Sequence, residues 1–262
     1  MESGLSRSRS VESERAGLFD TAQAGRLHRD ATNRTKGSVM TFRDRAHAGV
    51  LLAKELAMYR GDPNAVILAL PRGGVVVGYE LSMALHLPLE VFLTRKLRTV
   101  NNPDCAVGAV SETGALYVNQ EAASACRLSG EDIQELALGE EGELQRQRTL
   151  YRQGRPLPAL ANHTVILVDD GIATGATLFA TITSMAALSP RRVIAAMPVA
   201  PSDKSSRIRP LVDQCVILAT PEPFSTVGAL YADFEPVTDE QVLALLEAAH
   251  RERARSPSFS RT

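Results

Sequence analysis

The chain has 262 residues, and its 29 lysines and arginines nearly balance 30 aspartates and glutamates, giving a formal charge of −1. This balance excludes electrostatic capture of nucleic acid or of an anionic membrane as the main activity. Aromatic residues make up 5% of the chain and tryptophan is absent, which argues against a surface that stacks single-stranded bases. The apolar run Thr164–Val168 is far shorter than the roughly 20 residues that span a bilayer. We therefore expect a soluble, cytoplasmic protein with neither nucleic acid nor membrane as a partner.

Composition divides the chain into three parts. Residues 1–39 are rich in serine and arginine and show no sustained hydrophobic period, so we predict a disordered N-terminal extension. Residues 253–262 are again rich in arginine and serine and are predicted to form a disordered tail. No linker rich in proline, glycine or serine divides residues 40–252, which we expect to form one domain.

Hydrophobic patterns within residues 40–252 alternate between helix and strand periods. Capping boxes at Ser129–Asp132 and Thr238–Gln241 mark the starts of two helices. Strands that are continuously apolar and separated by helices indicate an α/β fold, with a central, mostly parallel sheet covered by helices on both faces. In chain order we predict a helix at 46–58, strand 65–70, helix 75–85, strand 89–93, a hairpin of 106–110 and 115–118, helix 130–152, strand 164–168, helix 177–188, strands 192–199 and 214–219, and a helix from 238 to about 252.

The most informative stretch runs from Val165 to Thr177. A buried strand ends in the adjacent carboxylates Asp169 and Asp170, and a loop with two glycines and two threonines leads into a helix. Ligands of open α/β sheets bind beyond the carboxyl ends of strands. Backbone N–H groups of the loop and of the helix N-terminus suit a phosphate monoester, whereas the carboxylates suit the hydroxyls of a neighbouring sugar. The stretch therefore predicts a sugar-phosphate site.

This stretch resembles the motif with which type I phosphoribosyltransferases bind 5-phosphoribosyl 1-pyrophosphate (PRPP). The wider pattern from Phe42 to Glu247 is similar to a bacterial and archaeal subgroup, some of whose members are fused to a dienelactone-hydrolase-like domain. This chain has no Gly-x-Ser-x-Gly nucleophile elbow of such a hydrolase. The resemblance implies the family's fold, with a small hood beside the sheet. It also implies PRPP contacts at Asp169, Asp170, Gly171, Ala173, Thr174, Gly175, Ala176 and Thr177.

The resemblance extends to the segments that hold pyrophosphate in this family. Leu70–Gly74 stands where the pyrophosphate-binding loop is expected, with Arg72, Gly73 and Gly74 as contacts and a cis peptide expected at Gly73. Arg95 and Lys96 match a basic pair that contacts pyrophosphate in orotate-type enzymes. Residues 99–106 match the mobile loop that closes over the reacting centre.

Two other phosphate-binding motifs are excluded by their missing residues. A P-loop requires Gly-Lys-Ser/Thr, which the chain lacks. A response-regulator receiver requires a lysine after its last strand, and none follows Lys204.

Ala173 stands where enzymes for 6-oxopurines carry an acid that acts on the purine, so this acceptor class loses its general base. Candidate acceptor-pocket segments are 105–128 and 221–234, whose aromatic residues either stack on a base or pack under a loop.

The resemblance implies a transfer reaction in which a nitrogen nucleophile, a nucleobase or related heterocycle, displaces pyrophosphate from C1 of PRPP. Asp169, Asp170 and Lys96 are the candidate catalytic residues. Mg²⁺ is the expected cofactor; PRPP would hold it, with Asp169 or Asp170 contacting it through water. A non-catalytic PRPP or nucleotide sensor of the same fold and a hydrolase that uses water remain alternatives. The acceptor and the assembly state, including a homodimer, stay open.

Overall fold

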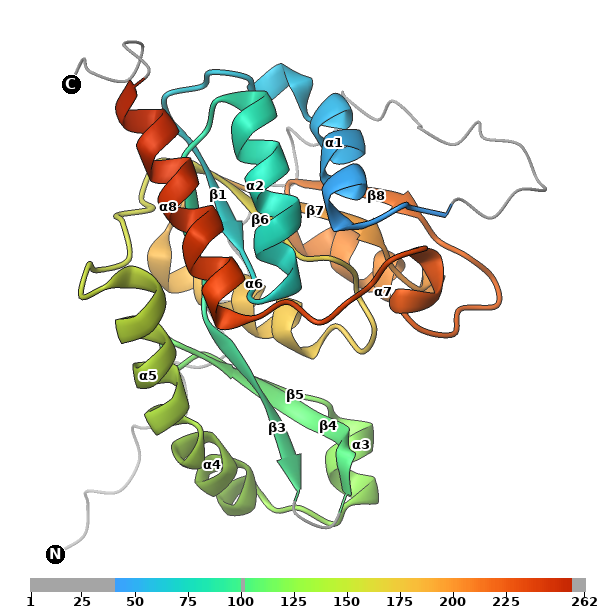
Figure 1. Cartoon of the computed structure of the whole chain (residues 1–262). Coiled ribbons are helices and arrows are strands. Elements are labelled where there is room, and N and C mark those ends of the chain that lie inside the picture. Colours follow the sequence, from blue (N-terminus) through green and yellow to red (C-terminus); the bar gives the residue numbers. More distant parts are fainter. Residues whose placement is uncertain (1–40, 100–101, 256–262) are drawn as a thin grey trace, which may run out of the picture. The chain divides into compact units, whose positions relative to one another are not determined.

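A five-stranded parallel sheet forms the centre of the protein (Figure 1). The computed structural model describes residues 41–99 and 102–255. Strand order is β2-β1-β6-β7-β8, and every neighbouring pair is parallel. This confirms the predicted α/β class and all five predicted core strands, within two residues at each end. The strands are β1 (Ala65–Ala69), β2 (Leu89–Val91), β6 (Thr164–Val168), β7 (Arg192–Val199) and β8 (Gln214–Ala219).

Helices cover both faces of this sheet, as predicted. In Figure 1, α1, α2 and α8 lie in front of the strands, whereas α6 and α7 lie behind them. Alternate residues of one strand enter different cores: Ile166 packs with the front helices, and Val165 packs with the rear ones. Burial on both faces explains why β1 and β6 are apolar at nearly every position. The bounds are α1 (Arg45–Glu55), α2 (Gly73–Leu85), α6 (Ala176–Leu188), α7 (Ser202–Ile208) and α8 (Asp239–Arg255).

A smaller unit of three antiparallel strands and three helices follows β2, and it forms the hood. Its strands β3, β4 and β5 include the predicted hairpin, which is confirmed. The predicted loop 99–106 is wrong in part, because β4 begins at Asn102 and pairs with β3; residues 100–101 lie outside the described residues. The bounds are β3 (Thr94–Thr99), β4 (Asn102–Ser111), β5 (Leu116–Val118), α3 (Gln120–Ala125), α4 (Gly130–Gly139) and α5 (Glu141–Arg152).

Helix boundaries supply the other corrections. The single helix predicted over 130–152 is divided at Glu140, directly after Gly139, a residue that weakens a helix interior. Both predicted capping boxes are present: Ser129 exchanges hydrogen bonds with Asp132, and Thr238 does so with Gln241. Helix α8 continues to Arg255, so residues 253–255 do not belong to a disordered tail. The rest of that tail and the predicted extension 1–39 lie outside the described residues.

The chain after β8 passes the carboxyl ends of the strands before α8 begins (Figure 1). It contains the short 3-10 helix η3 (Gly228–Leu230), and Tyr231 pairs in parallel with Phe42 just before α1. Two further 3-10 turns are η1 (Ala57–Tyr59) and η2 (Arg209–Leu211). None of the helices in the described ranges is both long enough and apolar enough to cross a membrane.

Candidate functional site

The two predicted ligand-binding segments lie side by side because β1 and β6 are adjacent parallel strands. Leu70, which follows β1, donates its backbone N–H to the carbonyl of Val168 at the end of β6 (2.8 Å). Residues 70–74 and 169–175 therefore leave the sheet at the same edge. This edge, at the carboxyl ends of the strands, is where open α/β sheets bind ligands.

The acidic pair is held by contacts from distant parts of the chain. Arg45, at the start of α1, donates from Nε to Asp170 Oδ2 at 2.7 Å. The hydroxyl of Tyr231 donates to the backbone carbonyl of Asp170 (2.6 Å). The backbone N–H of Asp170 donates to Asp169 Oδ1 (2.8 Å). The two carboxylates thus have different environments, because Asp170 has a cationic partner and Asp169 has a backbone amide.

Burial raises the pKa of Asp169 well above its ordinary value of 3.8, and the negative charge of Asp170 raises that pKa further. The backbone N–H of Asp170 and the positive charge of Lys96 act in the opposite direction on the same pKa. Burial likewise raises the pKa of the Tyr231 hydroxyl, so this group stays a hydrogen-bond donor at neutral pH. Keeping Asp169 at this edge therefore costs free energy, which is typical of a functional carboxylate.

The glycine pair explains how the two loops approach so closely. A Cβ on Gly73 would lie 1.8 Å from Asp170 Oδ2, and one on Gly74 would lie 2.9 Å from the Cα of Asp169. Both glycines belong to the first turn of α2, which begins two residues earlier than the predicted helix 75–85. The first-turn N–H groups of a helix lack partners within the helix and suit an anion. The cis peptide joins Pro71 to Arg72, one residue earlier than expected.

We predict that Gly73→Ala displaces the Asp170 carboxylate while leaving the fold intact, because the added methyl group and Oδ2 cannot both keep their places. The affinity for Mg²⁺-PRPP, measured by calorimetry, should fall about tenfold, the effect of losing one hydrogen bond to a charged group. Gly130→Ala is the matched control, because a Cβ there meets only open space. Equal affinities for the two variants would contradict the close approach of the loops.

The predicted phosphate loop leads directly into α6. Gly175 has φ of +79°, a conformation that side-chain-bearing residues rarely adopt, and it precedes the first helical residue. The hydroxyl of Thr174 accepts a long hydrogen bond from the N–H of Ala176 (3.4 Å). The first turn of α6 carries no acidic residue, so nothing in it opposes an anion. The remaining predicted contacts, Gly171, Ala173 and Thr177, belong to this same strand-loop-helix segment.

The basic residues predicted to contact pyrophosphate are only partly brought together. Arg95 and Lys96 are consecutive in β3, so their side chains point to opposite faces. Arg95 donates from Nε to Glu140 between α4 and α5 (2.7 Å), whereas the charge of Lys96 acts on Asp169 and lowers its pKa. Arg72 is half-exposed and lies 3.8 Å from Asp239 at the start of α8. The charge of Lys96 thus acts on the acidic pair, whereas Arg95 has Glu140 as its partner.

The aromatic residues of segment 221–234 pack under the returning chain. Tyr231 is buried, and its ring lies 5.2 Å from that of Phe42 and 4.9 Å from that of Phe234. The ring of Phe234 supports the guanidinium of Arg45 at 3.7 Å. Of the two alternatives for these residues, packing fits the contacts of Tyr231 and Phe234. Arg45 has no predicted role in the site, since its only signal in the sequence is its place in the wider pattern from Phe42 to Glu247.

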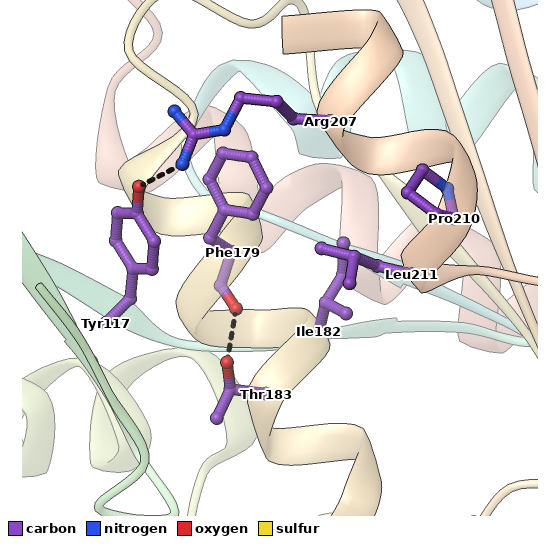
Figure 2. Close-up of a pocket in the computed structure, with 7 residues that line it drawn as sticks. All are labelled: Tyr117, Phe179, Ile182, Thr183, Arg207, Pro210 and Leu211. Carbon is purple, nitrogen blue, oxygen red and sulfur yellow. Dashed lines mark hydrogen bonds between the residues drawn. The ribbon is translucent and has the colours of Figure 1, made fainter. Parts of the chain in front are cut away.

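A pocket of about 520 Å³ lies where the hood strand β5 meets α6 and the chain from α7 to η2. Figure 2 shows the residues that line it. The rings of Tyr117 and Phe179 stack at 4.9 Å, and Arg207 donates to the Tyr117 hydroxyl (3.3 Å). The ring of Phe179 also lies against Gly175. These contacts anchor the hood strand β5 to the helix that begins at the phosphate loop. The lining is Tyr117, Phe179, Ile182, Thr183, Arg207, Pro210 and Leu211, none from the acidic pair.

Fold and site define an α/β protein in which an acidic pair and two loop-to-helix segments meet at the carboxyl edge of the central sheet. A family model described as the phosphoribosyl transferase domain matches residues 46–229. The Mycobacterium tuberculosis proteins named "Putative phosphoribosyl transferase" Rv0571c and MT0597 are each 38% identical over 213 residues, 81% of this chain and 48% of theirs. The crystal structure of TT1426 from Thermus thermophilus is similar with a TM-score of 0.66 and 41% identity, covering 79% of this chain and 98% of that one.

The chain belongs to the phosphoribosyl transferase domain family. The family resemblance inferred from the sequence is thereby confirmed. The chain spans about half the length of the two M. tuberculosis relatives that it matches.

Proposed function

We propose that the protein binds PRPP and transfers its 5-phosphoribosyl group to a nitrogen nucleophile with release of pyrophosphate. One observation carries this proposal: the carboxylate of Asp170 lies directly against the backbone of Gly73. The groups suited to sugar hydroxyls therefore lie next to the groups suited to a diphosphate. PRPP requires that arrangement, because its pyrophosphate is bonded to C1, next to the ring hydroxyls.

Each part of PRPP has a partner in this proposal. Asp169 and Asp170 accept hydrogen bonds from the ribose hydroxyls. Residues 173–177 bind the 5′-phosphate with backbone N–H groups and threonine hydroxyls. Arg72, Gly73, Gly74 and Lys96 bind pyrophosphate. Arg95 is left out of this set, because its guanidinium is already paired with Glu140.

The reaction breaks the bond from C1 to the pyrophosphate oxygen and forms a bond from C1 to nitrogen. Positive charge develops on the ribose ring while negative charge leaves with pyrophosphate. The residues named above stabilise both charges by position and electrostatics. Ala173 offers no base, so in this proposal the nitrogen attacks through its lone pair while still protonated, and its proton passes afterwards to pyrophosphate or water.

Mg²⁺ fits the donors present at this edge. In the described ranges, no group of three or more His, Cys, Asp or Glu residues could hold a metal by protein ligands alone. Mg²⁺ typically takes one or two carboxylates and completes its shell with substrate phosphates and water. Asp169 and Asp170 are the carboxylates that would contact it, directly or through water. When bound, the ion would neutralise charge on the leaving pyrophosphate.

Calorimetric titration of the full chain with PRPP, with and without Mg²⁺, tests the binding step. We expect Mg²⁺-dependent affinity, and its absence would contradict the proposal. Pyrophosphate release, measured against a panel of nucleobases and amines, then tests the transfer. Release that requires one acceptor supports transfer, whereas release without any acceptor indicates hydrolysis. If PRPP binds but no pyrophosphate is released with any acceptor, a PRPP sensor replaces the transferase as the proposed function.

A further inference from the structure

Arg45 lies outside the glycine loop and the acidic motif, and its guanidinium contacts the Asp170 carboxylate directly. It opens α1, whose start is fixed by Asp44, the N-cap residue that accepts from the N–H of His47 (2.7 Å). Three groups hold its guanidinium: Asp170 Oδ2 at 2.7 Å, the Glu235 carbonyl at 2.8 Å and the Phe234 ring at 3.7 Å. These partners lie 125 to 190 residues away in sequence. The tertiary fold therefore sets the position of this guanidinium.

The Arg45–Asp170 pair is largely removed from water. The side chains are 11% and 16% exposed, respectively. Stability alone is a weak reason for such a pair, because desolvation of the two charges offsets much of their attraction. The geometry around Gly73 gives a better reason for this ion pair. A Cβ on Gly73 would lie 1.8 Å from Asp170 Oδ2 and 2.9 Å from Arg45 Nε, so guanidinium, carboxylate and loop backbone meet at one point.

We propose that Arg45 is a positioning residue of the transferase site, which acts by holding the Asp170 carboxylate against the Gly73 backbone. Two contacts then fix Asp170 from opposite ends: Tyr231 binds its backbone carbonyl, and Arg45 binds its side chain. The carboxylate is thereby held beside the place where the proposed function puts the ribose hydroxyls. This inference rests on the proposed function, because it assigns Asp170 to the ribose.

The same guanidinium connects the site with the chain that returns after β8. Phe234 and the Glu235 carbonyl both belong to the segment between η3 and α8. A displacement of this segment would move Arg45 and with it the carboxylate. Arg45 thus makes the ribose contact depend on the placement of residues 231–237, a segment that neither the glycine loop nor the acidic motif includes.

The test compares Arg45→Gln, Arg45→Lys and Asp170→Asn, alone and combined, in calorimetric titrations with Mg²⁺-PRPP and with inorganic pyrophosphate. Arg45→Gln should weaken PRPP binding about tenfold and leave pyrophosphate binding unchanged, since Arg45 acts on the ribose contact. Arg45→Lys should recover part of the loss, because an ammonium keeps the charge without the planar fork. Adding Arg45→Gln to Asp170→Asn should cause no further loss, as expected for residues that act as one unit.

Arg43→Gln is the matched control, two residues earlier and exposed, and it should bind PRPP like the wild type. Equal PRPP affinity in Arg45→Gln and Arg43→Gln, or additive losses with Asp170→Asn, would overturn the inference. A wild type that does not bind PRPP would instead overturn the proposed function. In that event a crystal structure of Arg45→Gln decides on Arg45 alone: the Asp170 carboxylate should leave Gly73, and an unmoved carboxylate would overturn the inference.

Discussion

Asp169→Asn is expected to weaken PRPP binding by roughly 10- to 100-fold and, at neutral pH, to make the folded protein more stable. The loss of affinity follows from losing a hydrogen bond between a charged acceptor and a ribose hydroxyl, worth about 1.5–3 kcal/mol. The gain in stability follows from the raised pKa of Asp169, caused first by burial and then by the charge of Asp170. An uncharged asparagine avoids both penalties, and its amide oxygen can still accept the N–H of Asp170.

The pH dependence of this gain has a definite sign. The Asp169 carboxyl ionises less readily in the folded chain than in the unfolded chain. The free energy of unfolding of the wild type therefore falls, relative to the variant, as pH rises from the ordinary value of 3.8 through the raised pKa. The stability advantage of Asp169→Asn over the wild type grows across this pH range and reaches its full size above it. Urea unfolding of both proteins at several pH values between about 5 and 8 measures the difference.

Asp170→Asn provides the contrast. It should weaken PRPP binding to a similar extent, but it should destabilise the fold by about 1–3 kcal/mol because the largely buried Arg45 loses its charged partner. An Asp169→Asn variant that unfolds more easily than the wild type at every pH would contradict the assigned environment of Asp169. Unchanged PRPP affinity in both variants would remove the acidic pair from the site.

Much of the fold could be predicted because its elements are determined locally. The strands Ala65–Ala69 and Thr164–Val168 are buried on both faces, and continuous apolar runs are the direct consequence. The capping boxes at Ser129 and Thr238 involve residues three apart and are readable as such. The division at Glu140 is missed, because a single glycine such as Gly139 is often tolerated inside a helical pattern and does not by itself predict a break. The close approach of Gly73 and Gly74 to the acidic pair could not be predicted from local patterns, because it joins segments about one hundred residues apart.

Some residues of the candidate site are visible in local sequence patterns, and others join it only through long-range contacts. Asp169, Asp170 and the loop that follows form one contiguous motif, so spacing alone located them. Arg45 joins them only through a contact across 125 residues, and periodicity carries no record of such a contact. The different partners of Arg95 and Lys96 depend on which side of β3 each residue faces, which a pair of adjacent basic residues does not reveal.

A buried ion pair joins the hood to the sheet and carries the largest expected effect on stability. Glu112, in the turn between β4 and β5, pairs with Arg152 at the end of α5, and both side chains are almost fully buried. Glu112 also accepts the N–H of Leu93 (2.9 Å), and Arg152 donates to the carbonyl of Val91 (2.8 Å). The pair thus connects the last helix of the hood, its hairpin turn and the segment after β2.

Glu112→Gln should therefore destabilise the protein by about 3–5 kcal/mol, because the Arg152 guanidinium stays buried without its counter-charge. Urea unfolding monitored by circular dichroism measures the loss. Replacing both residues, in Glu112→Leu/Arg152→Met, should recover part of it, because removing both charges ends the desolvation penalty; the recovery stays incomplete, because the N–H of Leu93 and the carbonyl of Val91 lose their partners. Glu143→Gln is the control, since its ion pair with Arg146 is exposed and contributes little. Equal midpoints for Glu112→Gln and Glu143→Gln would show that the Glu112 carboxylate does not neutralise Arg152.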